Sequence, residues 1–177
     1  MNLARAILVV LVSITGWGWA QSLAAEAPWM LPEGRLQLVS GNPSAVYFVD
    51  LDRLSKSGDI ADIWIYQVLD PGFYVGGKQV VQIVSHERID CLKRHRHGIG
   101  QASFDGAGKV LVTMPAEDLG AVLSGRPHDF IARYVCDGLE LPAENIVTGH
   151  AEAFRQGRIL IRKGPPGQDS RREPRTP

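Results

Sequence analysis

Two histidines, His95 and His97, have the spacing that suggests chemistry most directly. Side chains alternate between the two faces of a β-strand, so residues two positions apart lie on one face. Zinc takes three or four ligands from histidine, cysteine or carboxylate, and His86 or Asp90 could supply another. The segment Lys93–His97 is strongly basic, however, and a basic field opposes a dication. We therefore favour a solvated basic strand end, and a histidine-based metal-binding protein remains an alternative.

Catalysis by a nucleophile needs a serine or cysteine held next to a histidine and a carboxylate. The sequence contains no Gly-x-Ser-x-Gly motif. Its glycines at 76–77 and 106–108 do not open an evident helix, so they do not form a phosphate cradle. Asp50 and Asp52 could act as an acid–base pair, but aspartates in a polar turn are usually solvated. We expect no enzymatic activity and no cofactor; the alternative is a small periplasmic enzyme with an unrecognised site.

The two cysteines, Cys91 and Cys136, lie 45 positions apart. In an oxidising compartment an isolated pair is most simply a disulfide. Closing a loop of that length removes unfolded-state entropy worth about 4 kcal/mol in the chain-entropy model. Two free thiols, or one reactive nucleophile, are the competing interpretations. The spacing is not the C-x-x-C of redox catalysts.

Residues 1–25 have the features of a signal peptide. Arg5 is the only charged residue before Glu26, and the apolar run 6–14 has the length of a signal-peptide core. The run is too short for a spanning helix, which needs roughly 20 apolar residues. We therefore predict cleavage of this segment, only transient membrane contact, and export to the periplasm or cell surface of a Gram-negative bacterium.

Length and charge narrow the class of protein further. A chain of 177 residues with 45% hydrophobic residues predicts one domain with a real core. The 19 basic residues balance 19 acidic ones, so no basic field calls for nucleic acid. The predicted organisation is a signal peptide over 1–25, a lead-in over 26–43, the domain over 44–163 and a disordered tail over 164–177, which lacks apolar residues.

A succession of segments rich in β-branched and aromatic residues predicts the strands. No segment of crossover-helix length separates them, so we expect an antiparallel meander of about five or six strands. In the third strand Ser85 and Glu87 interrupt the alternation and suggest a bulge. The expected strands are 45–49, 60–69, 79–90, 96–104 and 109–114, with shorter ones at 35–39 and 158–162 and a glycine-bearing connection over 71–77.

The segment Pro127–Cys136 predicts a helix. Pro127 stands early, an acidic residue follows in the first turn, and Gly138 stands just past the end. The apolar stripe expected for burial comprises Phe130, Ile131, Tyr134 and Val135. Cys136 points away from the middle of that stripe, so either the last turn unwinds or the segment is a strand. We favour the helix, and hence an α+β fold.

Four short signatures follow one another along the chain: Tyr47–Asp50, Trp64 on its strand, Arg88–Cys91 and Val135–Asp137. Together they resemble the surface-adhesin protein E family of bacterial envelope proteins, over about residues 44–138. The resemblance implies an antiparallel sheet with a helix near the C-terminus, tied to one face by a Cys91–Cys136 disulfide. It also implies a binding role at the envelope.

Four aromatic residues could form a binding surface for an unknown protein partner. Trp64 and Tyr66 share one strand face, where a core position is commoner. Phe73 and Tyr74 lie in the connection that follows, and loops usually lie at the surface. We therefore expect a non-catalytic exported envelope protein that binds another protein or has a structural role, and that could form a homodimer.

Overall fold

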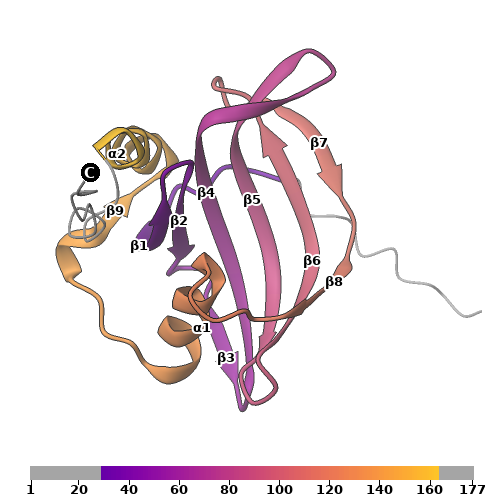
Figure 1. Cartoon of the computed structure of the whole chain (residues 1–177), viewed down its shortest axis with the longest axis vertical. Coiled ribbons are helices and arrows are strands. Elements are labelled where there is room, and N and C mark those ends of the chain that lie inside the picture. Colours follow the sequence, from indigo (N-terminus) through magenta and orange to yellow (C-terminus); the bar gives the residue numbers. More distant parts are fainter. Residues whose placement is uncertain (1–28, 164–177) are drawn as a thin grey trace, which may run out of the picture.

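The computed structural model describes residues 29–163, which form one antiparallel sheet and two helices (Figure 1). The predicted signal peptide and tail lie outside the described residues. The strands are β1 (Arg35–Asn42), β2 (Ala45–Asp50), β3 (Ser55–Ser57), β4 (Ile60–Val75), β5 (Lys78–Asp90), β6 (His95–Phe104), β7 (Val110–Met114), β8 (Glu117–Ala121) and β9 (Ile146–Thr148). The helices are α1 (Pro127–Asp137) and α2 (His150–Lys163), with a 3-10 turn over Ala143–Asn145. Neither helix has the length and apolar character needed to cross a bilayer.

The sheet confirms the predicted antiparallel α+β class. Its main order is β7-β6-β5-β4-β2-β1-β9, with β3 paired to β4 and β8 paired to β6. It has nine strands, more than the five or six expected, because β3 and β8 carry few apolar residues and β9 is only three residues long. The segment 26–43, expected as a lead-in, contributes β1, which pairs with β2 and β9.

Both faces of the sheet are apolar and both are covered. On β4, Ile63 and Ile65 join the core cluster that includes Ile131 of α1. Tyr66 and Val68 alternate with them and join the cluster that includes residues of α2. A strand buried on both faces does not alternate between apolar and polar residues. Val84 of β5 is an example, since it is 1% exposed and lies in the cluster that includes residues of α2.

The predicted terminal strand 158–162 is wrong, because this segment belongs to helix α2. Its buried residues Ala153, Gly157 and Ile161 repeat every four positions, which is a helical period. A short apolar run does not distinguish the two periods by itself. Gly157 allows close packing: a Cβ there would lie 2.9 Å from the Cβ of Val68 on β4.

Helix α1 is confirmed, but its buried face differs from the predicted stripe. Ile131 and Ala132 are fully buried, whereas Phe130 is 38% exposed. Cys136 lies one turn after Ala132 and therefore reaches the sheet without any unwinding of the last turn. The helix ends at Gly138, whose φ of 71° is the left-handed conformation typical of a helix terminus.

The predicted connection 71–77 is wrong, because β4 continues through it to Val75. Gly76 and Gly77, with φ of 55° and 77°, make the two-residue turn to β5. A register shift separates Val68 from Phe73, and this irregularity contains the strand-breaking pair Pro71 and Gly72. The resulting β4–β5 hairpin projects beyond the rest of the sheet at the top of Figure 1.

Candidate functional site

The disulfide predicted between Cys91 and Cys136 is present and joins the end of β5 to α1. The two Cα atoms lie 5.4 Å apart, which is ordinary for a disulfide. Two further contacts hold the end of α1: Arg94 forms an ion pair with Asp137, and Lys56 Nζ donates to the carbonyl oxygen of Cys136 at 3.1 Å. We call this region the clamped end of the sheet. Because the cysteines are bonded to each other, neither is a free nucleophile.

A buried carboxylate, Glu87, supports the same helix. Its side chain is 4% exposed and accepts two hydrogen bonds from Arg96, both at 2.9 Å. His128, in the first turn of α1, lies 3.6 Å from Glu87 Oε1. Burial alone would raise the pKa of Glu87. The hydrogen bond with His128 and the charge of Arg96 lower the pKa by more than burial raises it, so the pKa lies below its ordinary value. The β5–β6 register shift at Glu87 agrees with the bulge suggested by the sequence.

Of the four aromatic residues considered for a binding surface, Tyr66 is a core residue, as is commoner for its strand position, so it does not contribute to a surface. It is 1% exposed, and its hydroxyl group donates to Gln82 Oε1 at 2.5 Å. The cause is α2, which covers the sheet face on which Tyr66 lies. Burial raises the pKa of Tyr66.

Trp64 is half-buried within a stack of side chains. The ring of His86 lies parallel to its ring at 4.4 Å between centroids, and the Arg53 guanidinium lies 4.2 Å from the Trp64 centroid. Trp29 contacts the same ring at 5.4 Å. These side chains cover the Trp64 ring, so Trp64 does not form one exposed surface with Phe73 or Tyr74.

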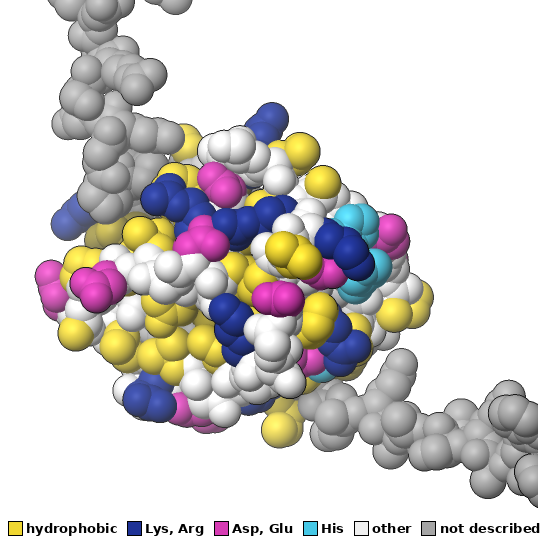
Figure 2. All heavy atoms as spheres, turned by 90° about the horizontal axis from the view of Figure 1, so that it is seen from below, with side chains coloured by type: hydrophobic (Ala, Val, Ile, Leu, Met, Phe, Trp, Pro, Cys, Tyr) yellow, Lys and Arg dark blue, Asp and Glu magenta, His cyan; other side chains and the backbone are white. Residues whose placement is uncertain are grey.

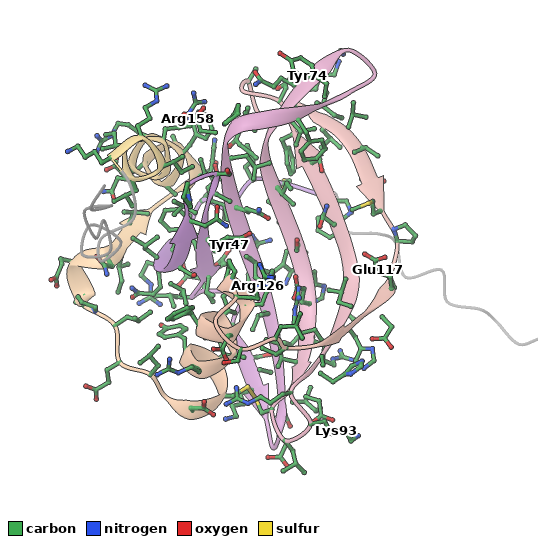
Figure 3. All side chains as sticks on the ribbon, viewed as in Figure 1. Tyr47, Tyr74, Lys93, Glu117, Arg126 and Arg158 are labelled. Atoms are coloured by element: carbon green, nitrogen blue, oxygen red, sulfur yellow. A yellow bond between two sulfur atoms is a disulfide. The ribbon has the colours of Figure 1, made fainter. Side chains whose placement is uncertain are left out.

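Phe73 and Tyr74 are exposed near the tip of the β4–β5 hairpin, where Figure 3 labels Tyr74. Phe73 is 47% exposed and Tyr74 is 70% exposed. The base of the hairpin is firmly packed, since a Cβ on Gly72 would lie 1.7 Å from the carbonyl oxygen of Val80. Only glycine fits this close approach between the two strands.

Ion pairs fix the same base to α2. Asp70 accepts hydrogen bonds from Arg158 Nε at 2.7 Å and Arg162 Nε at 3.1 Å. Partial burial alone would raise the pKa of Asp70. The hydrogen bonds from Arg162 and Arg158 lower the pKa by more than this, so the ionised carboxylate is the stable form. The hairpin is therefore attached to a helix that follows it by about 90 residues in sequence, as the separations of 88 and 92 positions indicate.

An open cavity of about 550 Å³ lies beside the hairpin. Residues of β5, of the β6–β7 turn and of α2 line it. Tyr74 lies directly opposite Gln79, a lining residue, and directly opposed residues share a face of the sheet, so Tyr74 lies on the cavity side. We call this surface the hairpin site; it comprises Tyr74, Lys78, Gln79, Asp105, Phe154 and Arg158. Phe73 is paired with the buried Val80 and therefore lies on the opposite face of the hairpin.

A second cavity, of about 250 Å³, lies between β1, α1 and α2. Leucine, valine and phenylalanine side chains dominate its lining, and none of its described lining residues is titratable. Hydrophobic side chains also gather at the left of Figure 2, on the side where Figure 1 places the α1–β9 connection. An enzyme pocket needs polar groups that converge on a substrate, and this cavity offers no acid or base among its described residues.

The structure brings His95 and His97 together, but with a different third residue from the one expected. His86 pairs with Asp62 at 2.6 Å and Asp90 pairs with Lys93 at 3.2 Å, so neither completes the group, and that part of the prediction is wrong. Asp118 on β8 lies beside both histidines instead. Asp118 could not be found from the sequence pattern, because β8 has only two apolar residues, Leu119 and Ala121, and was not predicted as a strand.

The fold and these sites define the class: a disulfide-tied antiparallel α+β module with exposed aromatic residues on a projecting hairpin. The sequence profile of the family described as surface-adhesin protein E matches residues 36–137, which is more than half of the chain. The chain belongs to the surface-adhesin protein E family, as its short signatures suggested, and family membership indicates a non-catalytic, adhesin-like protein of the bacterial envelope.

Solved structures of Haemophilus influenzae protein E are similar to this chain. Crystal form II is 18% identical with a TM-score of 0.48, and the match covers 63% of this chain and 94% of that one. A structure of protein E from a non-typeable strain is 13% identical with a TM-score of 0.41, covering 77% and 94%. Comparison with curated protein sequences finds no match.

Proposed function

We propose that this protein is a non-catalytic binding module, exported to the periplasm or outer surface, and that a partner protein docks on the hairpin site. The observation that carries the proposal is the 70% exposure of Tyr74, on the cavity side of a hairpin that is fixed at its base. Exposed aromatic residues on a rigid support are the usual anchors of protein interfaces. Export rests on the signal-peptide features of residues 1–25.

The composition of the hairpin site indicates the chemistry of the partner. Tyrosine and arginine are enriched among the residues that dominate binding energy, and the site contains Tyr74 and Arg158. Lys78 adds a second cation at the cavity. The Arg158 guanidinium lies 5.6 Å from the Phe154 ring, so the two form one aromatic and cationic patch. Asp70 pairs with Arg158 and Asp105 also lines the cavity, so these carboxylates balance the two cations. We therefore infer a protein segment with apolar side chains at its centre.

A binding role fits the described residues better than a catalytic one, because the groups that could react are paired or bonded to other residues. The buried carboxylate Glu87 is engaged by Arg96, and the two cysteines are joined. The apolar cavity beside α1 has no titratable group among its described lining residues. Family membership supports the same choice.

Site-specific photocross-linking tests the proposal. A benzophenone amino acid replaces Tyr74 in one variant and Leu92 in the matched control. Leu92 is 77% exposed and follows Cys91 next to Lys93, which Figure 3 labels at the opposite end of the sheet from Tyr74. In cells, we expect position 74 to cross-link one discrete envelope protein and position 92 to give none. Equal cross-linking at both positions would contradict the hairpin site, and a cross-link between two copies would replace the partner with a homodimer.

A further inference from the structure

We propose that His95, His97 and Asp118 bind a divalent transition-metal cation such as Zn²⁺. One ligand atom from each residue lies within 4.8 Å of the other two. In Figure 2 histidine side chains gather at the right of the face, on the β6–β8 side of the molecule, with basic and acidic side chains beside them. This site lies apart from the hairpin site and does not depend on the proposed function.

Two paired strands bring the three residues together. His95 and His97 lie on one face of β6 because they are two positions apart. Asp118 on β8 stands directly opposite His97. A register shift between Arg96 and His97 adds an extra residue to β8, and Gly120 adopts a φ of 75° there. This bulge turns the carboxylate of Asp118 toward the histidine pair.

The backbone orients the carboxylate in the manner of a metal site. Asp118 Oδ1 accepts a hydrogen bond from the Gly120 amide at 2.9 Å. Hydrogen bonds from outside the first coordination shell commonly fix ligand orientation in metal sites. Asp118 is therefore directed before any cation arrives, and less side-chain freedom is lost on binding.

The distances between ligand atoms suit a small cation after modest adjustment. Asp118 Oδ1 lies 2.5 Å from His95 Nε2 and 3.8 Å from His97 Nδ1. With metal–ligand bonds of about 2.1 Å, tetrahedral ligand atoms lie roughly 3.4 Å apart. The side chains are 32%, 53% and 63% exposed for His95, His97 and Asp118, so no packing opposes this adjustment. Three protein ligands leave a fourth position for water.

The basic neighbours that oppose a cation in the sequence are paired with carboxylates in the structure. Each of the three basic side chains between and before the histidines has its own acidic partner, which reduces the field at the site. The pairs are Lys93–Asp90 at 3.2 Å, Arg94–Asp137, and Arg96–Glu87 at 2.8 Å. Glu117, opposite Gly98 on the neighbouring strand, adds another negative charge beside Asp118.

The donor set selects the class of metal. Two imidazole nitrogens and one carboxylate oxygen suit zinc, copper and nickel, whereas calcium and magnesium prefer oxygen donors alone. An exposed site with three ligands binds such ions reversibly, because water competes for the coordination positions.

Equilibrium dialysis of the purified protein against Zn²⁺, with metal quantified by mass spectrometry, tests the site. The variants are His97→Gln and Asp118→Asn, and the matched control is His150→Gln, which removes a histidine from the start of α2. We expect one Zn²⁺ per chain in the wild type and the control, and binding at least about tenfold weaker in each variant. No saturable binding, or variants equal to the control, would overturn the proposal.

A measurement without substitutions covers the case in which a variant fails to fold. In the wild-type protein, imidazole NMR signals of His95 and His97 should shift or broaden as Zn²⁺ is added, while those of His86, His128 and His150 stay in place. A shift of the latter three alone would also overturn the site.

Discussion

The two ends of the sheet are built for different purposes. At the clamped end, a disulfide, a buried Glu87–Arg96 pair and the contacts of Arg94 and Lys56 fix α1 onto the strands. At the hairpin end, the tightly packed Gly72 and ion pairs to α2 fix only the base, and Phe73 and Tyr74 remain exposed. We infer that stability is concentrated at the clamped end and recognition at the hairpin end.

Among the substitutions that test this division between the two ends, removal of the disulfide should change the free energy of unfolding most. The double substitution Cys91→Ser and Cys136→Ser should lower the free energy of unfolding by up to about 4 kcal/mol, because the unfolded chain regains its freedom. Urea denaturation measures the change, and reduction of the wild type serves as the matched control. An unchanged midpoint would show that noncovalent contacts alone hold α1.

The Glu87→Gln substitution should have the next largest effect, about 2–3 kcal/mol, since it breaks charged hydrogen bonds and leaves Arg96 unpaired in a site where its side chain is 13% exposed. The folded-state pKa of Glu87 is lowered, so its stabilisation is present above the ordinary value of 4.5 and is lost as the pH falls through the folded-state value.

Denaturation of wild type and Glu87→Gln between pH 7 and pH 3 checks this dependence. The difference in free energy of unfolding should be full at pH 7 and should shrink in acid. A difference that grows as the pH falls would mean that the pKa of Glu87 is raised, and that burial outweighs Arg96 and His128.

The sequence predicts a helix or strand correctly where the local residue pattern alone determines the structure of that segment. The β-branched segment around Val46 and Phe48 predicted a strand, and Pro127 and Gly138 predicted the ends of α1. Helix α2 was missed because its apolar run, residues 159–161, also fits a short strand, and because its closest contact depends on a glycine, Gly157. Long-range contacts decide such cases, and single-sequence patterns do not contain them.

The candidate sites also contain some residues that local spacing predicts and others that only the pairing of distant strands brings into place. His95 and His97 were predicted from their spacing alone, whereas Asp118 joins them only through the pairing of β6 with β8. The aromatic residues were predicted as a group, but α2 buries Tyr66 and leaves Tyr74 outside. Burial on a second sheet face is a property of the whole fold, so a strand pattern could not separate the two residues.

A substitution at the base of the hairpin should have a smaller effect on stability. Asp70→Asn removes the charge that attracts Arg158 and Arg162, and we expect a loss of at most about 1 kcal/mol because water screens these pairs. Hydrogen exchange should nevertheless become faster for amides of β4 and β5 beyond Gly72. Unchanged exchange there would show that the close strand packing alone fixes the hairpin.

The smallest effect on stability is expected for Tyr74→Ala, within about 0.5 kcal/mol, since the side chain is 70% exposed. Thermal unfolding measures it. A larger loss would mean that Tyr74 supports the fold, and the division between the two ends would be weaker than we infer.

The most direct test of the account is the affinity of the cross-linked partner for three proteins: wild type, Tyr74→Ala and the control Leu92→Ala. If the hairpin end performs recognition, Tyr74→Ala should weaken binding by about 2 kcal/mol or more, roughly thirtyfold, while Leu92→Ala binds like the wild type. Equal affinity of all three proteins, or a loss only in Leu92→Ala, would contradict it.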